Sequence, residues 1–204
     1  MYCVKCRGEY IGSKRCPLCQ LPLVPEQRPE FNPNSENIDY DELMNWIRRA
    51  SGQLTIPLYT TDIGIEKKWR FPYYGFGYAW MRQMQGACEF VQVDLVLDEL
   101  IRKRSTRFPF RGYGFAWAES LVGSIGGTPL KLRADRVKRE HKWGFPYQGF
   151  GRAWAERFSG ECGNRITVEL VITSVGRHSE YGFPYKGYGF AWENRGELIL
   201  RIAT

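Results

Sequence analysis

A ten-residue motif rich in aromatic residues and glycine occurs four times in this chain of 204 residues. Its pattern is F-P-[YF]-x-G-[FY]-G-x-A-W. The copies, which align without gaps, are Phe71–Trp80, Phe108–Trp117, Phe145–Trp154 and Phe183–Trp192. Their nearly constant period, about 37 residues, is typical of a repeat architecture in which each copy builds one supersecondary unit.

A second regularity pairs the copies. The first and third are each preceded by Lys-Trp and followed, eight residues after the motif Trp, by a cysteine, Cys88 or Cys162. The second and fourth share the run G-Y-G-F-A-W. The larger unit is therefore a pair of motifs, which predicts pseudo-twofold symmetry within a fourfold plan.

Between the motifs, apolar residues alternate with polar ones, which indicates strands with one buried face. Examples of the alternation are Val91/Val93/Leu95/Leu97, Leu130/Leu132/Ala134, Ile166/Val168/Leu170/Ile172 and Leu198/Leu200/Ile202. The end of each motif is expected to form a second strand, so each repeat is mainly a hairpin. Glycine-containing loops are expected to join the strands, at Gly86, Gly123/Gly126/Gly127, Gly160/Gly163 and Gly196.

The sequence therefore predicts a mainly all-β domain over residues 53–204, with four hairpins closing into a barrel or ring. A four-bladed propeller is the alternative, although a period of about 37 residues is short for a four-stranded blade. Residues 54–58 resemble a further strand, whose Pro57 favours a sheet edge. Pairing of that strand with the last one, Glu197–Ala203, would remove both open edges.

Within the motif, proline fixes its own backbone and keeps the preceding phenylalanine extended, while the glycines permit sharp turning. We interpret the Phe and Trp positions mainly as core, since buried aromatic rings dominate core energetics. The alternative is that some rings present stacking faces to a ligand. The candidates for stacking are Tyr73, Tyr74, Phe110, Tyr147 and Tyr185.

Ahead of the repeats lie two further segments. Residues 25–52 form a proline-rich linker and a short helix. Asp39 can cap that helix, Leu43 and Ile47 have helical spacing, and Gly52 is a natural stop, which predicts a helix over 40–50.

Residues 1–24 contain two C-x2-C pairs nine residues apart, formed by Cys3, Cys6, Cys16 and Cys19. Two such pairs suit a tetrahedral Zn²⁺ ion, and so short a segment needs the metal to fold. The runs C-V-K-C-R-G-E-Y and R-C-P-L-C-Q-L-P-L-V resemble short bacterial zinc ribbons. The resemblance implies a closed, structural zinc site; rubredoxin-like iron and a redox dithiol remain alternatives.

The formal charge of +7 lies in the repeats, since residues 1–50 hold seven basic and seven acidic residues, whereas residues 51–204 hold 22 and 15. A basic domain favours anionic partners, and basic clusters beside aromatic loops suit a phosphate backbone with stacked bases. Solvated charged loops are the alternative reading. The candidates for phosphate contact are Lys67, Lys68, Arg102, Arg104, Arg107, Lys138, Arg139 and Lys142.

Nothing in the sequence predicts catalysis. There is no phosphate-binding loop and no hydrolase or zinc-protease motif, and the recurring residues build shape instead of moving protons. His141 and His178 fit charged surface segments, and Cys88 and Cys162 fit packed or free thiols. Glu119 and Glu156 could be paired carboxylates, although charges on a strand surface explain them equally well.

The sequence thus predicts a non-catalytic zinc-ribbon protein that engages an anionic partner, either nucleic acid or an acidic protein surface, with nucleic acid favoured. The alternatives are an adaptor or assembly subunit, whose repeat edges could mediate self-association, and a ring that binds a small anion such as a nucleotide. The chain has no apolar run of transmembrane length and its start is unlike a secretory signal, so a cytoplasmic location without membrane contact is expected.

Overall fold

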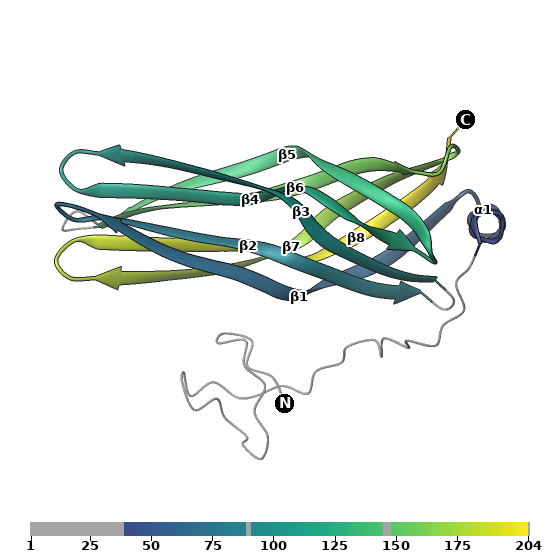
Figure 1. Cartoon of the computed structure of the whole chain (residues 1–204), viewed down its shortest axis with the longest axis horizontal. Helices are drawn as coiled ribbons and strands as arrows, with labels where there is room; N and C mark the ends of the chain where they lie inside the picture. Colours follow the sequence, from purple (N-terminus) through teal and green to yellow (C-terminus); the bar gives the residue numbers. More distant parts are fainter. Residues whose placement is uncertain (1–38, 89–90, 145–147, 204) are drawn as a thin grey trace, which may run out of the picture. The chain divides into compact units, whose positions relative to one another are not determined.

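A computed structural model of the chain describes residues 39–203 except 89–90 and 145–147. The described part is mainly all-β, with one short helix and eight antiparallel strands in a closed barrel (Figure 1). This confirms the predicted fold class and favours the barrel over the propeller. The elements are α1 (Tyr40–Arg49), β1 (Gln53–Arg70), β2 (Tyr74–Cys88), β3 (Val91–Arg107), β4 (Arg111–Ile125), β5 (Thr128–Gly144), β6 (Gln148–Cys162), β7 (Ile166–Gly182) and β8 (Lys186–Ile202).

Helix α1 begins where the sequence predicts. The Asp39 side chain accepts a hydrogen bond of 2.8 Å from the backbone N–H of Glu42, which satisfies one of the free donors of the first turn. Leu43, Met44 and Ile47 are buried in the same core cluster as the aliphatic residues of the barrel. The helix lies at the end of the barrel opposite the motif turns (Figure 1).

Strands β1 and β8 pair with each other over Gln53–Tyr59 and Arg195–Arg201, which closes the barrel. This confirms the expected pairing of the first and last strands. Pro57 lies opposite Glu197 of β8, in the part of β1 that precedes its ladder with β2. A residue without a backbone N–H is tolerated there because no ladder on the other side requires the donor.

The strands form four long hairpins, β1–β2, β3–β4, β5–β6 and β7–β8, and the first, second and fourth motifs each begin in the turn of a hairpin. Pairing within a hairpin extends to its turn, whereas pairing between hairpins is confined to the half near α1; β4 and β5, for example, pair only over Ser120–Ile125 and Thr128–Arg133. Each hairpin ladder is interrupted by a register shift at Asp62, Glu99, Arg136 or Ser174. We call the half near α1 proximal, and the half beyond the shifts, residues 63–81, 100–118, 137–155 and 175–193, distal.

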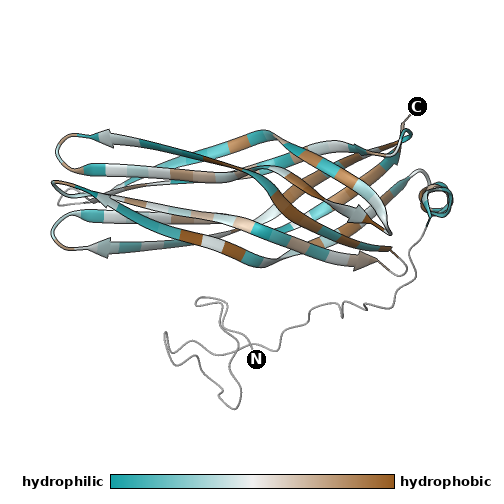
Figure 2. Ribbon diagram, viewed as in Figure 1, coloured by the Kyte–Doolittle hydropathy of each residue, from teal (hydrophilic) through white to brown (hydrophobic). Residues whose placement is uncertain are grey.

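The two halves have different interiors. The proximal half is filled by aliphatic side chains such as Leu95, Leu121 and Leu200 together with those of α1, and Figure 2 shows the strongly hydrophobic residues concentrated there. In the distal half, the inner strands β2, β4, β6 and β8 approach one another through the motif glycines. A Cβ atom added at Gly77, Gly114, Gly151 or Gly189 would lie 2.5–2.8 Å from the carbonyl oxygen of the corresponding glycine in the adjacent hairpin.

Several glycines that were predicted to lie in loops lie within strands instead. Gly86, Gly123 and Gly160 each face the backbone carbonyl of a residue in a neighbouring strand, and a Cβ atom would overlap it. Gly196 likewise lies within β8. Close approach between strands, and not turning, explains these glycines. Only Gly126, Gly127 and Gly163 of the predicted set lie in turns of the described chain, with φ values of 53°, 88° and 61°.

Candidate anion-binding face of the hairpins

Positive charge is concentrated in the distal half of the hairpins. Those four segments contain 14 Lys and Arg residues against four Asp and Glu residues. The remainder of the chain therefore holds slightly more acidic than basic residues, because the whole protein carries only +7. Such a separation produces a positive field over one half of the barrel, which attracts anionic partners.

The predicted phosphate contacts all lie in the outer strands β1, β3 and β5, and not in loops. Some are already ion-paired: Lys67 with Glu180, Lys68 and Arg102 with Glu66, and Lys138 with Glu156. Four others have no carboxylate partner among the residues that the structure describes. These four are Arg104, Arg107, Arg139 and Lys142.

The predicted stacking residues mostly contact one another. Tyr73, Phe110 and Tyr185 come from three different turns, and their ring centroids lie 5.3–6.0 Å apart. Tyr74 lies 6.4 Å from Phe110, and all four rings are half-buried. These contacts join the three turns at the distal end. The predicted residue Tyr147 lies outside the described residues.

The first phenylalanine of the motif is exposed. Phe71, Phe108 and Phe183 have 79%, 88% and 93% of their surface accessible, so the interpretation of these positions as core is wrong. The turn reverses the chain at this residue and leaves its side chain beyond the last strand pair. The motif tryptophans Trp80, Trp117, Trp154 and Trp192 are buried, as predicted.

Two further exposed aromatic residues were not among the sequence candidates. Trp69 and Trp143 belong to the repeated Lys-Trp pair, and a cationic side chain from an adjacent hairpin lies over each of their rings. Lys186 Nζ lies 4.8 Å from the ring centroid of Trp69, and Arg111 Cζ lies 4.7 Å from that of Trp143. The repetition of Lys-Trp was the signal that could have identified them. Their cationic partners depend on how the hairpins are arranged and could not be read from the sequence.

Arginines also cover three of the motif tryptophans across the interfaces between hairpins. Arg102 of β3 lies 4.8 Å from the Trp80 ring, Arg139 of β5 4.8 Å from Trp117, and Arg177 of β7 4.9 Å from Trp154. These distances are within the range of cation–π attraction. At the interface of β6 and β7, the surface is hollowed into a pocket of about 260 Å³ that includes Lys138, Trp154 and Arg177.

The carboxylates Glu119 and Glu156 are each held by basic residues of the neighbouring strand β5. Glu119 pairs with Arg133 and accepts a hydrogen bond from the Trp117 indole, and Glu156 pairs with Arg136 and Lys138. Glu193 is completely buried, and one of its oxygens accepts the backbone N–H of Ala155 at 2.7 Å. Burial raises the pKa of Glu193 to about 7.

His141 and His178 both pack against aromatic rings. His178 stacks on Phe190 and lies 3.2 Å from a carboxylate oxygen of Glu180. His141 is exposed and lies with its ring edge-on, 5.0 Å from the rings of both Tyr113 and Phe115. Both side chains therefore belong to the distal surface, as charged segments before a motif suggested.

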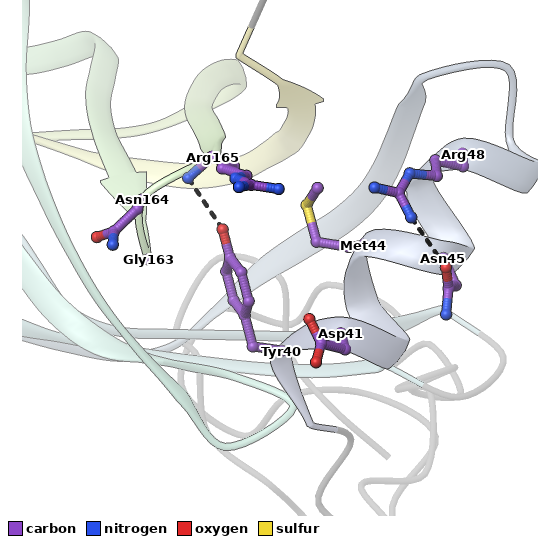
Figure 3. A pocket seen from close by; sticks show the side chains of 8 residues that line it. All are labelled: Tyr40, Asp41, Met44, Asn45, Arg48, Gly163, Asn164 and Arg165. Carbon is purple, nitrogen blue, oxygen red and sulfur yellow. Dashed lines mark hydrogen bonds between the residues drawn. The ribbon is translucent and has the colours of Figure 1, made fainter.

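A second hollow, of about 590 Å³, lies between α1 and the turn that joins β6 to β7 (Figure 3). The Tyr40 hydroxyl accepts the backbone N–H of Arg165 at 2.9 Å and so attaches the helix to this turn. The side chains around the hollow include Asp41, Asn45 and Arg48, and Arg48 donates to Asn45. We attribute a structural role to the Tyr40 contact.

The proposed zinc ligands Cys3, Cys6, Cys16 and Cys19 lie outside the described residues. Within the part that the structure describes, no group of three or more His, Cys, Asp or Glu side chains is placed to hold a metal, and no helix is long and apolar enough to cross a membrane. Cys162 is buried, which raises the pKa of its thiol to about 11, and Cys88 packs half-buried against the same core cluster. The high pKa makes the Cys162 thiol a poor nucleophile.

Comparison with known proteins adds no further constraint on the site. No protein family, curated protein or solved structure with which the chain was compared matches it significantly.

Proposed function

We propose that the chain is a non-catalytic nucleic-acid-binding protein that uses the distal half of its four hairpins. The observation that carries the proposal is the excess of basic residues in that half, 14 against four acidic ones, together with exposed aromatic rings at its turns. Lys and Arg neutralise phosphates, and aromatic rings offer a stacking surface to unpaired bases.

The distribution of these groups favours an extended polymer over a small ligand. Arg104 and Arg107 lie on β3, Lys142 lies on β5, and the exposed Phe71 and Phe183 come from two other hairpins. Contacts spread over several hairpins are suited to a chain of phosphates and bases. Phenylalanine has no hydrogen-bonding group on its side chain. Its ring can therefore stack on any base and does not distinguish one base from another.

The test is the fluorescence anisotropy of labelled single- and double-stranded DNA and RNA, measured with the full chain over a series of salt concentrations. We expect affinity to fall steeply with salt, because binding releases counterions. Replacing Arg104 and Arg107 with Glu should weaken binding at least tenfold. The control is the double variant Lys131→Glu with Arg201→Glu, which lowers the net charge by the same amount in the proximal half. Its affinity should change far less.

A second function is favoured by one observation, the exposure of Phe71, Phe108 and Phe183. Exposed apolar residues of this size are common at protein–protein interfaces. An adaptor or assembly subunit would form a complex that is insensitive to moderate salt and would bind each nucleic acid only weakly at low salt. That combination in the anisotropy and size-exclusion experiments would reject nucleic-acid binding.

We further propose that residues 1–24 hold a structural zinc ion through Cys3, Cys6, Cys16 and Cys19, and that the four hairpins are copies of one repeated unit. Two C-x2-C pairs support the first proposal, since four thiolates complete a closed tetrahedral shell. The second is supported by the register shifts at Asp62, Glu99, Arg136 and Ser174, which recur in step with the motif.

A further inference from the structure

The stacked arginines occupy matching positions in three interfaces between hairpins. Arg102, Arg139 and Arg177 recur in step with the motif, and each faces the motif tryptophan of the preceding hairpin. We name the interfaces by the strands that meet there: β2/β3, β4/β5 and β6/β7. The shared geometry allows the residues around each arginine to be compared position by position.

In two of these interfaces the protein supplies a carboxylate to the arginine. At β2/β3, Glu66 Oε2 lies 2.7 Å from Arg102 Nη1, and at β6/β7, Glu140 Oε1 lies 3.7 Å from Arg177 Nη2. Glu66 and Glu140 are separated by two periods of the motif and hold the same place in their hairpins. Each of these arginines is therefore partly neutralised from within the chain.

In the β4/β5 interface the same place is taken by a lysine. Lys103 lies midway between Glu66 and Glu140 in the sequence, and it pairs in register with Phe115, as Glu66 pairs with Tyr78. Its Nζ lies 5.7 Å from the Trp117 ring centroid, and Arg139 Cζ lies 4.8 Å from that centroid. Two exposed cations thus lie over one buried indole, and neither has a carboxylate partner in the described chain. A second cation also lies near Trp80 (Arg82, 6.0 Å) and near Trp154 (Lys138, 5.8 Å), but there it pairs with Asp62 or Glu156.

The nearby acidic residue does not compensate for this change. Glu119 accepts the Trp117 indole N–H at 3.0 Å and pairs with Arg133 at 3.6 Å, and it has no ion pair with Lys103 or Arg139 in the described chain. His141 adds a further polar ring on the same face, against Tyr113 and Phe115.

The fourth interface, β8/β1, lacks the arginine. Ile65 takes its place, and Lys67 and His178 both contact Glu180. Among the interfaces formed by described residues, β4/β5 is therefore the one in which the stacked arginine and the residue at the place of Glu66 and Glu140 are both basic, and neither has an ion pair with a carboxylate.

We propose that the β4/β5 interface is a binding site for a phosphate group, which takes the place that a glutamate carboxylate occupies in the β2/β3 and β6/β7 interfaces. A guanidinium can bind two phosphate oxygens side by side, and a lysine adds a point charge. The inference rests on the proposed function in so far as a nucleic-acid backbone supplies the phosphate. Free inorganic phosphate has the same chemistry and is the second possible source.

The experiment titrates inorganic phosphate into the ¹⁵N-labelled full chain at constant ionic strength, with chloride as the control, and follows the Arg139 side-chain Nε–H signal by NMR. We expect this signal to shift with saturation. In Lys103→Glu the response should be lost or weakened at least tenfold, because the introduced carboxylate would pair with Arg139 as Glu66 does with Arg102. This variant copies a side chain that two other interfaces already contain, and its thermal midpoint reports whether it folds.

The reverse exchange is the second arm. Glu66→Lys, or the milder Glu66→Gln, removes the internal carboxylate from Arg102 and should make the Arg102 signal respond to phosphate. Absence of a phosphate-dependent shift at Arg139 in the wild-type protein would overturn the proposed phosphate site, whether or not the protein binds nucleic acid. An equal response in folded Lys103→Glu would overturn it as well.

Oligonucleotide affinity separates the two sources. If Lys103→Glu loses both the phosphate response and at least tenfold in oligonucleotide affinity, the site is occupied by the nucleic-acid backbone. If it loses the phosphate response while oligonucleotide affinity stays unchanged, the site stands and takes free phosphate. Failure of all nucleic-acid binding alongside a saturable Arg139 shift would reject the proposed function and leave the phosphate site intact.

Discussion

At the scale of single residues, Glu193 is the position where buried charge has the clearest consequence. It follows the fourth motif tryptophan, where the other three copies have Met81, Ala118 and Ala155. One of its carboxylate oxygens has no hydrogen-bond partner among the described residues, and burial raises its pKa from 4.5 to about 7. The folded protein therefore keeps a proton that the unfolded chain loses at lower pH.

We predict that this residue makes the protein less stable as the pH rises from about 4.5 to about 7. The stabilisation that results from the raised pKa is fully present below pH 4.5, the pKa of the unfolded chain. It is lost as the pH rises through about 7, the pKa in the folded protein. A shift of this size is worth at most about 3 kcal/mol. Chemical unfolding of the wild type and Glu193→Gln at several pH values measures it.

Glu193→Gln is the informative variant because the neutral amide oxygen can still accept the N–H of Ala155. Near pH 5 the two proteins should have similar free energies of unfolding, whereas at pH 8 the variant should be the more stable. Other titrating groups are common to both proteins and cancel in the difference. A difference that does not change with pH would contradict the assignment.

At the scale of strands and hairpins, the glycine contacts between β2, β4, β6 and β8 set the spacing of the distal half. We predict that Gly114→Ala lowers the free energy of unfolding by roughly 1–3 kcal/mol, because overpacking forces backbone shifts. The added Cβ would lie 2.6 Å from the carbonyl oxygen of Gly77. Urea unfolding monitored by circular dichroism gives the value.

The matched control is Gly182→Ala, in β7 near the turn of the fourth hairpin. A Cβ atom there would lie no closer than 3.5 Å to Tyr188 and Lys186, which is ordinary contact. This variant should have unchanged or slightly increased stability, since alanine restricts the unfolded chain more than glycine does. Equal losses in both variants would show that strand glycines matter for a reason other than close approach.

The sequence predicts the strands and their closure better than it predicts the contacts between hairpins. Apolar alternation, the motif turns and the capping residue Asp39 are local signals, so the hairpins and α1 followed from them. The pairing of β1 with β8 followed from the need to remove two open sheet edges. The roles of Gly86 and Phe71 did not follow, because one depends on which backbone lies opposite and the other on where a turn ends. Arg139 was correctly singled out as basic, but its position over Trp117 depends on packing between hairpins.

At the scale of the whole molecule, the charge separation also required the structure. The excess of basic residues in 51–204 is visible in the sequence. The sequence also places the basic clusters beside the motif loops, but the register shifts are needed to show where along each hairpin the basic half ends. The same boundary separates an aliphatic interior from an aromatic one, so the half that holds the fold together carries little of the proposed binding surface.

The last prediction concerns the metal. Residues 33–204 form a compact unit with its own core, so removal of zinc should leave the barrel folded. We expect one zinc per chain by elemental analysis and none in Cys3→Ser with Cys6→Ser, because two remaining thiolates cannot complete a tetrahedral site. The far-ultraviolet β signal and the thermal midpoint of the barrel should change little after chelation. Retention of zinc in the double variant would place the metal elsewhere, and collapse of the barrel on chelation would mean that its stability depends on residues 1–24.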